Sequence, residues 1–399
     1  MLQGKTVVLG VTGSIAAYKS VEIASRLIKL RCNVIVIMTS NAVNFVNPIT
    51  FEEITKNKCL VDTFDRNFQF NIKHISVSRL ADAVIIAPAS ANVIGKIANG
   101  IADDMLTTTV MACQCVKFLA PAMNTSMYTD SILQENLSKL YDHGYKIIEP
   151  IEGNLANGSV GRGKMASTSD IVEEIVYSIA KERDFTDKNI LITAGATREK
   201  IDPVRYISNY SSGKMALLIA REFALRGADV TVIAGACNVN PPKVKQYINV
   251  ETSEQMLEEV KKEYKFADIC IFAAAVCDFK FDKVCYSKIK KTSDKINITL
   301  ESTVDISRYV CENKEKKTYT CGFALETEDL ISNARIKMQN KGLDMIIANQ
   351  FDENNQVFGS DYNKVSIITQ NAETDLEKMD KEKLAEYIVT KIRDEITCA

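Results

Sequence analysis

Apolar runs alternate with segments of helical periodicity along the first half of the chain. The strand-like runs are TVVLGV, NVIVIM, AVIIAP and KFLAPA, and the first helical segment extends from about Ala16 to Leu30. Strands of a parallel sheet are buried on both faces and read as continuous apolar runs, while helices supply the crossovers between them. The pattern therefore predicts a doubly wound, mostly parallel α/β sheet.

The second half repeats this pattern as a separate unit. After an amphipathic helix near Ile171–Lys181, the polar stretch ERDFTDKN precedes a new strand, NILITAG. A helix after Lys214 and the runs ADVTVIAG, DICIFAAAV, YTCGFALE, LDMIIANQ and KVSIITQ follow. A chain of 399 residues exceeds one ordinary hydrophobic core. We therefore expect two tandem Rossmann-like α/β domains, residues 1–185 and 186–399, with the boundary near Thr186.

Charge and hydropathy exclude several classes of partner. The chain has 49 Lys and Arg against 51 Asp and Glu, so no global field attracts nucleic acid or an anionic membrane. The first residues, MLQGKTVVLGVTG, lack the features of a signal peptide, and no apolar run reaches membrane-spanning length. We expect a cytoplasmic protein without nucleic-acid or membrane partners, in which anionic ligands are held by local groups.

Cysteine and histidine usage argues against disulfides and zinc. The eleven cysteines are scattered through apolar segments, as Cys270 is in DICIFAAAV, which favours reduced core thiols. His74 and His143 are the only histidines, and Cys113 and Cys115 are the only closely spaced thiols. A structural zinc site would lack ligands.

Three loops of the first half stand where open α/β sheets bind ligands, at the carboxyl ends of strands. GVTGSIAAY places Gly10, Gly13 and Ser14 between a strand and a helix, where main-chain donors can hold a phosphate. This turn lacks the GxGxxG fingerprint, and a turn without any ligand explains it equally well. APASANVIGKIANGIADDML and APAMNTSMY follow the strands AVIIA and VKFL.

Together these segments resemble the flavoprotein cysteine decarboxylases, whose motifs include a PASAN loop, a His before the preceding strand, and PAMNxxM. The resemblance implies a flavodoxin-like domain that binds FMN, with His74 at the catalytic position and Asn124 as the Asn of PAMN. It also implies flavin contacts from Gly13, Ser14, Ile15, Ser40, Pro88, Ala89, Ser90, Asn92 and Met105.

The chemistry of that family suits these residue types. An N-acylated cysteine has no free amine for an imine cofactor, so loss of its carboxylate needs another electron sink. In the family the flavin takes hydride from the cysteine side chain, and the resulting thioaldehyde lets carbon dioxide leave as an enethiol forms. His74 would be the base or proton relay, and Asn124 would hold the carboxylate without adding charge. The plainer alternative is that His74 caps a helix and Asn124 closes a turn.

One position departs from the decarboxylase pattern. The family's substrate-covering loop has a Cys in a pattern like ACGDxGxGRM, whereas this chain reads ANGSVGRGKM, with Asn157 at the Cys position. That Cys supplies a proton when reduced flavin converts the enethiol to the saturated thiol, and an amide is a far weaker acid. Two alternatives follow: the N-terminal half stops at the enethiol, or it is a flavin-binding regulatory module.

The second half contains a long and specific block, ITAGATREKIDPVRYISNYSSGKM (192–215). Its SSGKM run does not have the spacing of a P-loop, so a P-loop NTPase is disfavoured. The block resembles the phosphopantothenate–cysteine ligases, and the resemblance continues through AAAVCDF, KIKK, GFALET and ARIKMQNKGLD. It implies substrate contacts from Ala273, Ala274, Asp278, Lys288, Val304, Asp305, Ile306, Ser307, Phe323, Lys337 and Lys341, with Asp278 also on the Mg²⁺ side.

These ligases join a carboxylate to an amine through an acyl-cytidylate made from CTP. Lys288, Lys337 and Lys341 would meet phosphates, and Asp305 and Ile306 match the family's base-reading PDI, although Val304 replaces the Pro. Asn209 corresponds to the Asn needed in the second step, where its amide could bond the acyl oxygen. The alternative for Lys337 and Lys341 is a solvated helix face.

Together the two resemblances imply a bifunctional enzyme of coenzyme A biosynthesis, a ligase and a decarboxylase acting on 4′-phosphopantothenate, cysteine and CTP. By resemblance, trimers of the first domain and dimers of the second would combine in a homo-oligomer, up to a dodecamer. An NAD-dependent dehydrogenase would need an acid after the second strand, and NVIVIMTSN has none there.

Overall fold

The computed structural model describes residues 2–63, 73–154, 158, 160–290, 297–314, 317–326, 328–350 and 360–397. The chain divides into two compact units, Met1–Lys181 and Glu182–Ala399. The boundary expected from the sequence, near Thr186, lies just beyond this division. Each unit is described by itself.

Unit 1 has a five-stranded parallel sheet in the order β2-β1-β3-β4-β5. Its strands are β1 (Thr6–Val11), β2 (Asn33–Met38), β3 (Ala83–Ala89), β4 (Val116–Pro121) and β5 (Lys146–Ile147). All residues of β1 and β3 are buried, which explains their unbroken apolar sequences. The order is that of flavodoxin-like folds, whose ligands bind where the strand order reverses, between β1 and β3.

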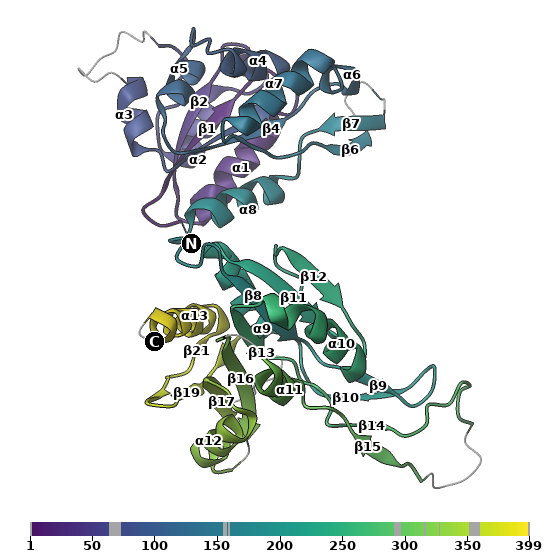
Figure 1. Cartoon of the computed structure of the whole chain (residues 1–399). Helices are drawn as coiled ribbons and strands as arrows, with labels where there is room; N and C mark the ends of the chain where they lie inside the picture. The colour runs from purple at the N-terminus through teal and green to yellow at the C-terminus, as the bar shows by residue number, and fades with distance from the viewer. Residues whose placement is uncertain are drawn as a thin grey trace. The chain divides into compact units, whose positions relative to one another are not determined.

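Helices cover both faces of this sheet (Figure 1). The helices of unit 1 are α1 (Ala17–Lys29), α2 (Pro48–Thr55), α3 (Lys73–Leu80), α4 (Ala91–Ala98), α5 (Met105–Ala112), α6 (Thr125–Tyr128), α7 (Ser131–Asp142) and α8 (Thr168–Ile179), with a 3-10 turn at Ala42–Asn44. Apolar residues of α4, α5 and α7 form one core cluster with the sheet, while α1 packs on β1, β2 and β3 beside α2 and α8.

An antiparallel hairpin, β6 (Ile151–Asn154) and β7 (Val160–Lys164), lies against the loop after β4. The main-chain N–H of Met123 donates to the carbonyl of Gly163 at 3.0 Å. Gly163 has a positive φ, and a side chain at this position would collide with the carbonyl oxygen of Met123. The hairpin therefore approaches the PAMN loop with backbone alone, a feature that the apolar pattern does not predict.

Unit 2 has an eight-stranded sheet in the order β12-β11-β8-β13-β16-β17-β19-β20. Its strands are β8 (Asn189–Ala194), β11 (Asp229–Ala234), β12 (Gln246–Asn249), β13 (Ile269–Phe272), β16 (Tyr319–Glu326), β17 (Met345–Gln350), β19 (Val365–Thr369) and β20 (Glu373–Asp375). The first six strands are parallel and have the 3-2-1-4-5-6 order of a Rossmann fold, whereas β19 and β20 add an antiparallel edge.

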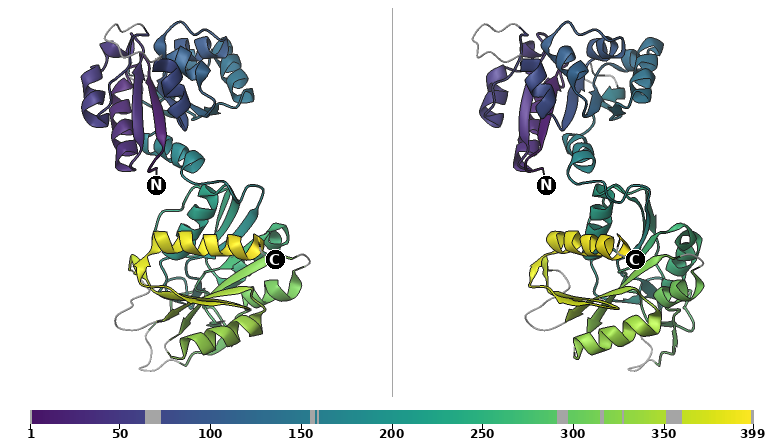
Figure 2. Two further views of the ribbon diagram at one scale, coloured as in Figure 1. Left: turned by 90° about the vertical axis from the view of Figure 1, so that its left-hand side faces the viewer. Right: turned by 60° about the vertical axis from the view of Figure 1, so that its left-hand side comes forward.

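The helices of unit 2 form two layers with separate cores. The helices are α9 (Lys214–Leu225), α10 (Ser253–Glu263), α11 (Ile306–Asn313), α12 (Leu330–Lys341) and α13 (Lys381–Thr397), with a 3-10 turn at Tyr264–Phe266. α9 and α13 share one core cluster with the sheet, and α10, α11 and α12 share the other. Figure 2 shows α13, in yellow, and α12, in light green, on different sides of the strands. The expected doubly wound architecture is confirmed in both units.

Two-stranded hairpins complete unit 2. β9 (Arg198–Lys200) pairs with β10 (Tyr206–Ser208), and β14 (Phe279–Phe281) pairs with β15 (Leu300–Ser302). Both hairpins extend away from the sheet (Figure 1). We call these two hairpins, residues 198–208, 279–290 and 297–302, the arm. A third small pair joins β18 (Tyr362–Asn363) to β21 (Met379–Asp380), directly before α13.

In the part of the chain that the structure describes, all ten cysteines are free, and six of them, Cys270 included, are buried. The expectation of reduced thiols is consistent with this arrangement. Among the described helices, none combines the length and the apolar character needed to cross a membrane.

Candidate active sites

In unit 1 the loops singled out in the sequence meet at the switch point between β1 and β3. The Thr12 hydroxyl donates to the carbonyl of Pro88 at 2.8 Å and accepts from the Ser90 N–H at 3.0 Å. The Ser14 hydroxyl donates to the carbonyl of Ala122 at 3.2 Å. The turn after β1 is therefore bonded to both the PASAN loop and the PAMN loop.

The loops at this junction contain small residues and exposed side chains that a ligand can contact. At the start of α1 the main-chain N–H groups of Ala16 and Ala17 donate to the hydroxyl and the carbonyl of Ser14 at 3.4 and 2.9 Å, so Ser14 and the exposed Ile15 lie directly at this helix end. A Cβ on Gly13 would lie 2.6 Å from Cβ of Asn41, so only glycine lets the loop that contains Ser40 approach. Ser40 and Asn92 are exposed, whereas the Met105 side chain is buried in the core at the start of α5. Among the predicted flavin contacts, Pro88, Ala89 and Met105 are buried, whereas the other six residues are exposed or partly exposed on the loops.

Asn124 has a fixed amide orientation. It precedes α6, and its Oδ1 accepts the main-chain N–H of Ser126 at 2.8 Å. Because the oxygen is used as this cap, the exposed Nδ2 is the part of the amide that can contact a ligand. Asn124 thus presents a neutral donor, as binding of a carboxylate requires.

The other two decarboxylase residues are less well defined by contacts. His74 is half-buried near the start of α3, which packs against α5. Asn157, the residue in place of the family Cys, lies outside the described residues.

Unit 2 contains a cavity of about 690 Å³ at the carboxyl ends of β8, β13 and β16. This volume is in the range of sites for cofactors and drug-sized ligands. Asn209 and all the predicted substrate residues except Lys288 line it: Ala273, Ala274, Asp278, Val304, Asp305, Ile306, Ser307, Phe323, Lys337 and Lys341. The structure therefore brings together residues from five separate segments of the sequence.

Lys288 lies elsewhere, exposed on the arm between β14 and β15. The next residue, Ile289, donates its N–H to Asp202 at 3.1 Å, and its carbonyl accepts from Arg205 at 2.8 Å. These bonds join the two hairpins of the arm, so Lys288 stands on an ordered projection outside the cavity lining of its own unit.

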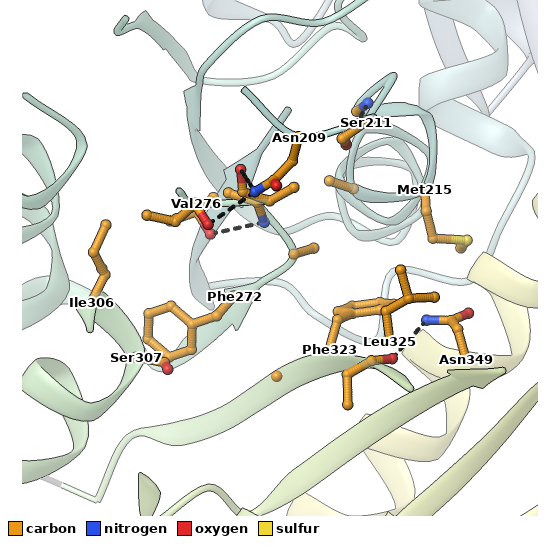
Figure 3. A pocket seen from close by; sticks show the side chains of 18 of the residues that line it. Asn209, Ser211, Met215, Phe272, Val276, Ile306, Ser307, Phe323, Leu325 and Asn349 are labelled. Carbon is orange, nitrogen blue, oxygen red and sulfur yellow. Dashed lines mark hydrogen bonds between the residues drawn. The ribbon is translucent and has the colours of Figure 1, made fainter. Parts of the chain in front are cut away.

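Asn209 is held by main-chain carbonyls on the opposite side of the switch point. Its Nδ2 donates to Ala275 O at 3.2 Å and to Val276 O at 3.1 Å (Figure 3). Two carbonyl oxygens can be bonded only by the nitrogen of the amide, which settles its orientation. The nitrogen is thereby engaged by main chain, and Oδ1 is the atom that remains to contact a reacting group.

The predicted nucleotide residues form a bonded cluster at one end of the cavity. Asp305 caps α11 by accepting from the N–H of Arg308 at 3.1 Å and from the Ser307 hydroxyl at 2.7 Å. Lys341 on α12 completes the cluster, with Nζ 2.8 Å from the Asp305 carboxylate. Burial opposes ionisation of Asp305, but hydrogen bonds from Lys341 and Ser307 outweigh it and lower the pKa of this carboxyl.

Part of the cavity lining is not predicted by the sequence. Lys214, Lys381, Asn349 and Asn363 also face this cavity. Lys214 belongs to the SSGKM run that was noted, but Lys381 stands in the polar run MDKEKL, where nothing distinguishes it from a surface lysine. Its proximity to the other residues arises only from the fold.

The two units thus define an enzyme with two doubly wound α/β domains, each with its candidate site at the sheet's switch point. Residues 1–180 match the family model described as Flavoprotein, and residues 185–396 match that of the DNA/pantothenate metabolism flavoprotein C-terminal domain. Unit 1 is therefore a flavoprotein domain.

Known proteins match both units at once. The chain is 40% identical over 391 residues to the coenzyme A biosynthesis bifunctional protein CoaBC of Haemophilus influenzae, covering 98% of each chain. It is 42% identical over 370 residues to that of Bacillus subtilis, covering 92% of this chain and 91% of the relative. A crystal structure of the C-terminal domain of a CoaBC protein is 33% identical, with a TM-score of 0.47, and covers 55% of this chain and 100% of that one. The chain belongs to the family of bifunctional coenzyme A biosynthesis proteins.

Proposed function

We propose that unit 2 joins 4′-phosphopantothenate to cysteine at the expense of CTP, and that unit 1 decarboxylates the product with FMN. The observation that carries the proposal is the cavity of unit 2, because Asn209, Asp278, Lys337 and Lys341 all line it. A carboxylate, a pair of lysines and a fixed amide in one space are what nucleotide activation of an acid requires.

In the first step, the carboxylate of 4′-phosphopantothenate attacks the α-phosphorus of CTP, and the bond to pyrophosphate breaks. Lys337 and Lys341 offset the charge of the departing phosphates. Asp278 is exposed at the cavity, while Asp305 is already paired with Lys341. Mg²⁺ typically binds one or two carboxylates together with substrate phosphates, so Asp278 is the residue that would hold it.

In the second step, the amine of cysteine attacks the acyl carbon, CMP leaves, and the nitrogen loses a proton. Asn209 has only its oxygen available, so it accepts a hydrogen bond from the attacking amine. The sequence suggested that this amide bonds the acyl oxygen as a donor; because its nitrogen donates to two main-chain carbonyls, we propose the acceptor role instead. Orienting the amine in this way accelerates attack on the acyl-cytidylate.

In unit 1, bound FMN would supply a two-electron acceptor for oxidation of the cysteine side chain. Gly13, Ser14, Ile15, Ser40, Pro88, Ala89, Ser90, Asn92 and Met105 are the proposed flavin contacts. Asn124 directs its Nδ2 donors to the substrate carboxylate and adds no charge that would hinder loss of carbon dioxide. His74 accepts or relays the proton.

The product of unit 1 is 4′-phosphopantetheine in the main proposal. The substitution at Asn157 keeps two alternatives testable, namely an N-terminal half that ends at the enethiol and one that is a regulatory flavin module. The retained Asn124 and His74 favour catalysis over a regulatory role.

We also propose that the protein is a cytoplasmic homo-oligomer, up to a dodecamer. The arm carries large apolar side chains in water, among them Tyr286, which is fully exposed, and Tyr206 and Phe279, which are about half exposed. Large exposed apolar patches usually mark contacts between proteins. Light scattering of the purified protein tests the oligomeric state.

Product analysis tests the proposed activities. The full chain is incubated with 4′-phosphopantothenate, cysteine, CTP and Mg²⁺, and mass spectrometry follows phosphopantothenoylcysteine and its decarboxylated product. Formation of neither amide nor pyrophosphate would contradict the ligase assignment. Accumulation of the amide without loss of carbon dioxide would contradict the decarboxylase assignment.

A further inference from the structure

The loop that carries Asn124 is held from one side by the strand β7, which lies beside α6 (Figure 1). The carbonyl of Gly163 accepts the main-chain N–H of Met123, the residue directly before Asn124, at 3.0 Å. A Cβ on Gly161 would lie 2.4 Å from Oγ1 of Thr125, the residue directly after Asn124. β7 therefore contacts the loop on both sides of Asn124.

Glu149 connects the far end of this loop to the same strand. The hydroxyl of Tyr128, the last residue of α6, donates to Oε2 of Glu149 at 2.6 Å. The guanidinium of Arg162 on β7 donates to the same oxygen at 3.0 Å and lies 5.7 Å from the centre of the Tyr128 ring. The main-chain N–H of Tyr128 in turn donates to the carbonyl of Asn124 at 2.9 Å. A single residue, Tyr128, thus links the Glu149 carboxylate to Asn124.

Of the two bonds to Glu149, the one from Tyr128 is the better protected from water. Tyr128 is 5% exposed, whereas the side chains of Arg162 and Glu149 are each 57% exposed. Exposed ion pairs contribute little because solvent screens them, while a hydroxyl that donates to a carboxylate makes a charge-assisted hydrogen bond. Burial raises the pKa of Tyr128 to about 12, and the hydrogen bond to Glu149 raises it too, so the hydroxyl keeps its proton and is the donor. Glu149 therefore acts on the loop mainly through Tyr128.

Glu149 itself is anchored to the sheet. It lies between β5 and β6, and the preceding residue, Ile148, is buried and donates its N–H to the Leu119 carbonyl of β4 at 2.8 Å. The carboxylate thus ties α6 to the edge of the sheet. Because Asn124 and Tyr128 are about one helical turn apart, a shift of Tyr128 would also move Asn124.

We propose that Glu149 is a positioning residue for decarboxylation, which acts through Tyr128 to set the place of the Asn124 amide. The inference rests on the proposed function of unit 1, in which Nδ2 of Asn124 donates to the substrate carboxylate. The oxygen of this amide is bound to the start of α6, so the direction of its nitrogen follows the position of α6. A misplacement of about 1 Å can cost an enzyme about a hundredfold in rate. Glu149 needs no contact with the flavin or the substrate for this role.

A double-mutant cycle tests whether Glu149 acts through Asn124. Glu149→Ala, Asn124→Ala and their combination are made in the full-length protein, and kcat/KM for loss of carbon dioxide from phosphopantothenoylcysteine is measured for each. Glu149→Ala should lower kcat/KM by about tenfold, as loss of a hydrogen bond to a charged group implies. In the Asn124→Ala background the same substitution should have little further effect, because the amide that Glu149 positions has been removed.

Two further variants separate the hydroxyl bond from the ion pair. Tyr128→Phe retains the buried ring and removes the hydroxyl, so its effect should match that of Glu149→Ala, and it replaces Glu149→Ala in the cycle if that variant does not fold. Glu149→Gln retains an oxygen that can accept from Tyr128 and should restore most of the lost kcat/KM. Glu53→Ala is the matched control, because Glu53 on α2 also pairs with a cation, Lys56, at 2.9 Å. Its kcat/KM should equal that of the unmodified protein.

Hydrogen exchange gives a readout that does not depend on turnover. The main-chain N–H groups of Met123 and Tyr128 should exchange faster in Glu149→Ala than in the unmodified protein, while flavin content and pyrophosphate release by unit 2 stay unchanged. Unchanged exchange, or an equal loss of kcat/KM with and without the Asn124 amide, would overturn the proposal. A loss of flavin in Glu149→Ala would overturn it too, because Glu149 would then support the flavin site.

Failure of the proposed function gives a different result. If the unmodified protein with bound flavin releases no carbon dioxide from phosphopantothenoylcysteine, the decarboxylase assignment of unit 1 is contradicted. The exchange rates of Met123 and Tyr128 then still show whether Glu149 holds the loop in place.

Discussion

The side-chain nitrogen of Asn209 lies 3.1 Å from the carbonyl oxygen of Val276. A second bond from the same nitrogen reaches the preceding carbonyl, so the amide cannot turn without breaking both. Asn124 in unit 1 has the opposite arrangement, with its oxygen bonded to main chain and its nitrogen exposed. One asparagine therefore offers an acceptor and the other a donor, which suits an attacking amine in unit 2 and a carboxylate in unit 1.

Replacing Asn209 tests the acceptor role. Asn209→Ala should leave carboxylate activation intact and slow amide formation by about tenfold to hundredfold, because the attacking amine loses its acceptor. The acyl-cytidylate should accumulate, which rapid quenching and mass spectrometry detect. Asn333→Ala removes an amide that also donates to a main-chain carbonyl but does not line the cavity, so it serves as the control. Equal losses of pyrophosphate release and amide would place Asn209 in nucleotide binding or folding instead.

Flavin binding should depend on the bonds between the loops of unit 1. The purified protein should be yellow, and the released cofactor should be FMN. Thr12→Val removes the buried hydroxyl that joins Pro88 and Ser90, leaving a Ser90 N–H without its partner at a cost of about 1–3 kcal/mol. Absorbance after gel filtration should report a lower flavin content.

Thr55→Val is the matched control for this substitution, because Thr55 is also buried and its hydroxyl donates to the carbonyl of Phe51 at 2.8 Å and accepts the N–H of Asn57 at 3.2 Å, at the end of α2 and outside the three loops. Its flavin content should equal that of the unmodified protein. Recovery of a colourless protein that takes up no FMN would remove the basis for the flavin site.

The ion pair between Asp305 and Lys341 predicts a contribution to the free energy of unfolding that depends on pH. Folding lowers the pKa of the Asp305 carboxyl. The ion pair therefore stabilises the protein fully above the pKa of the unfolded state, about 3.9, and this stabilisation is lost as the pH falls through the pKa of the folded state. Asp305→Asn should therefore lower the unfolding temperature near neutral pH, and the difference from the unmodified protein should shrink below pH about 4.

Glu312→Gln on the same helix provides the comparison. Glu312 pairs with Arg308 at the surface, where both side chains are more than half exposed, and such pairs contribute about 0–1 kcal/mol. An unfolding temperature of Asp305→Asn that matches that of Glu312→Gln at every pH would contradict the structural role of Asp305.

The substitution at Asn157 predicts an altered product. Oxidation of the substrate and loss of carbon dioxide need no proton from Asn157. Reduction of the enethiol does need a proton donor on the covering loop, and an amide is a poor proton donor. The enethiol should therefore appear beside or in place of 4′-phosphopantetheine, and Asn157→Cys should shift the product toward the saturated thiol. If the unmodified chain gives only 4′-phosphopantetheine, at a rate that Asn157→Cys leaves unchanged, another group donates the proton.

The sequence predicts the inner strands of both sheets, because these are continuous apolar runs, but it does not predict the edge strands β5, β12 and β20, which are short or polar. YTCGFALE, for example, is predicted as a strand, and β16 spans Tyr319–Glu326. The hairpins are not predicted, since β9, β10, β14 and β15 have three residues each and no apolar alternation long enough to detect.

Some residues of the candidate sites can also be predicted from the sequence, and others cannot. Residues at strand ends, such as Asn209 and Asp278, can be assigned from motifs, because the topology of an open α/β sheet fixes where strand ends meet. Lys381 could not be assigned, because its burial depends on how α13 packs beside α9 after the antiparallel edge has formed. The direction of the Asn209 amide also had to come from the structure, because its main-chain partners Ala275 and Val276 are far away in the chain.

A comparison of the two nucleotides CTP and ATP, with the amide and its decarboxylated products followed, tests the central claim most directly. The full chain receives 4′-phosphopantothenate, cysteine and Mg²⁺ with either CTP or ATP, and mass spectrometry quantifies phosphopantothenoylcysteine, the enethiol and 4′-phosphopantetheine over time. The account predicts rapid amide formation with CTP, much slower formation with ATP, and subsequent loss of carbon dioxide on the flavin domain. Equal use of the two nucleotides, or an amide that is never decarboxylated, would contradict it.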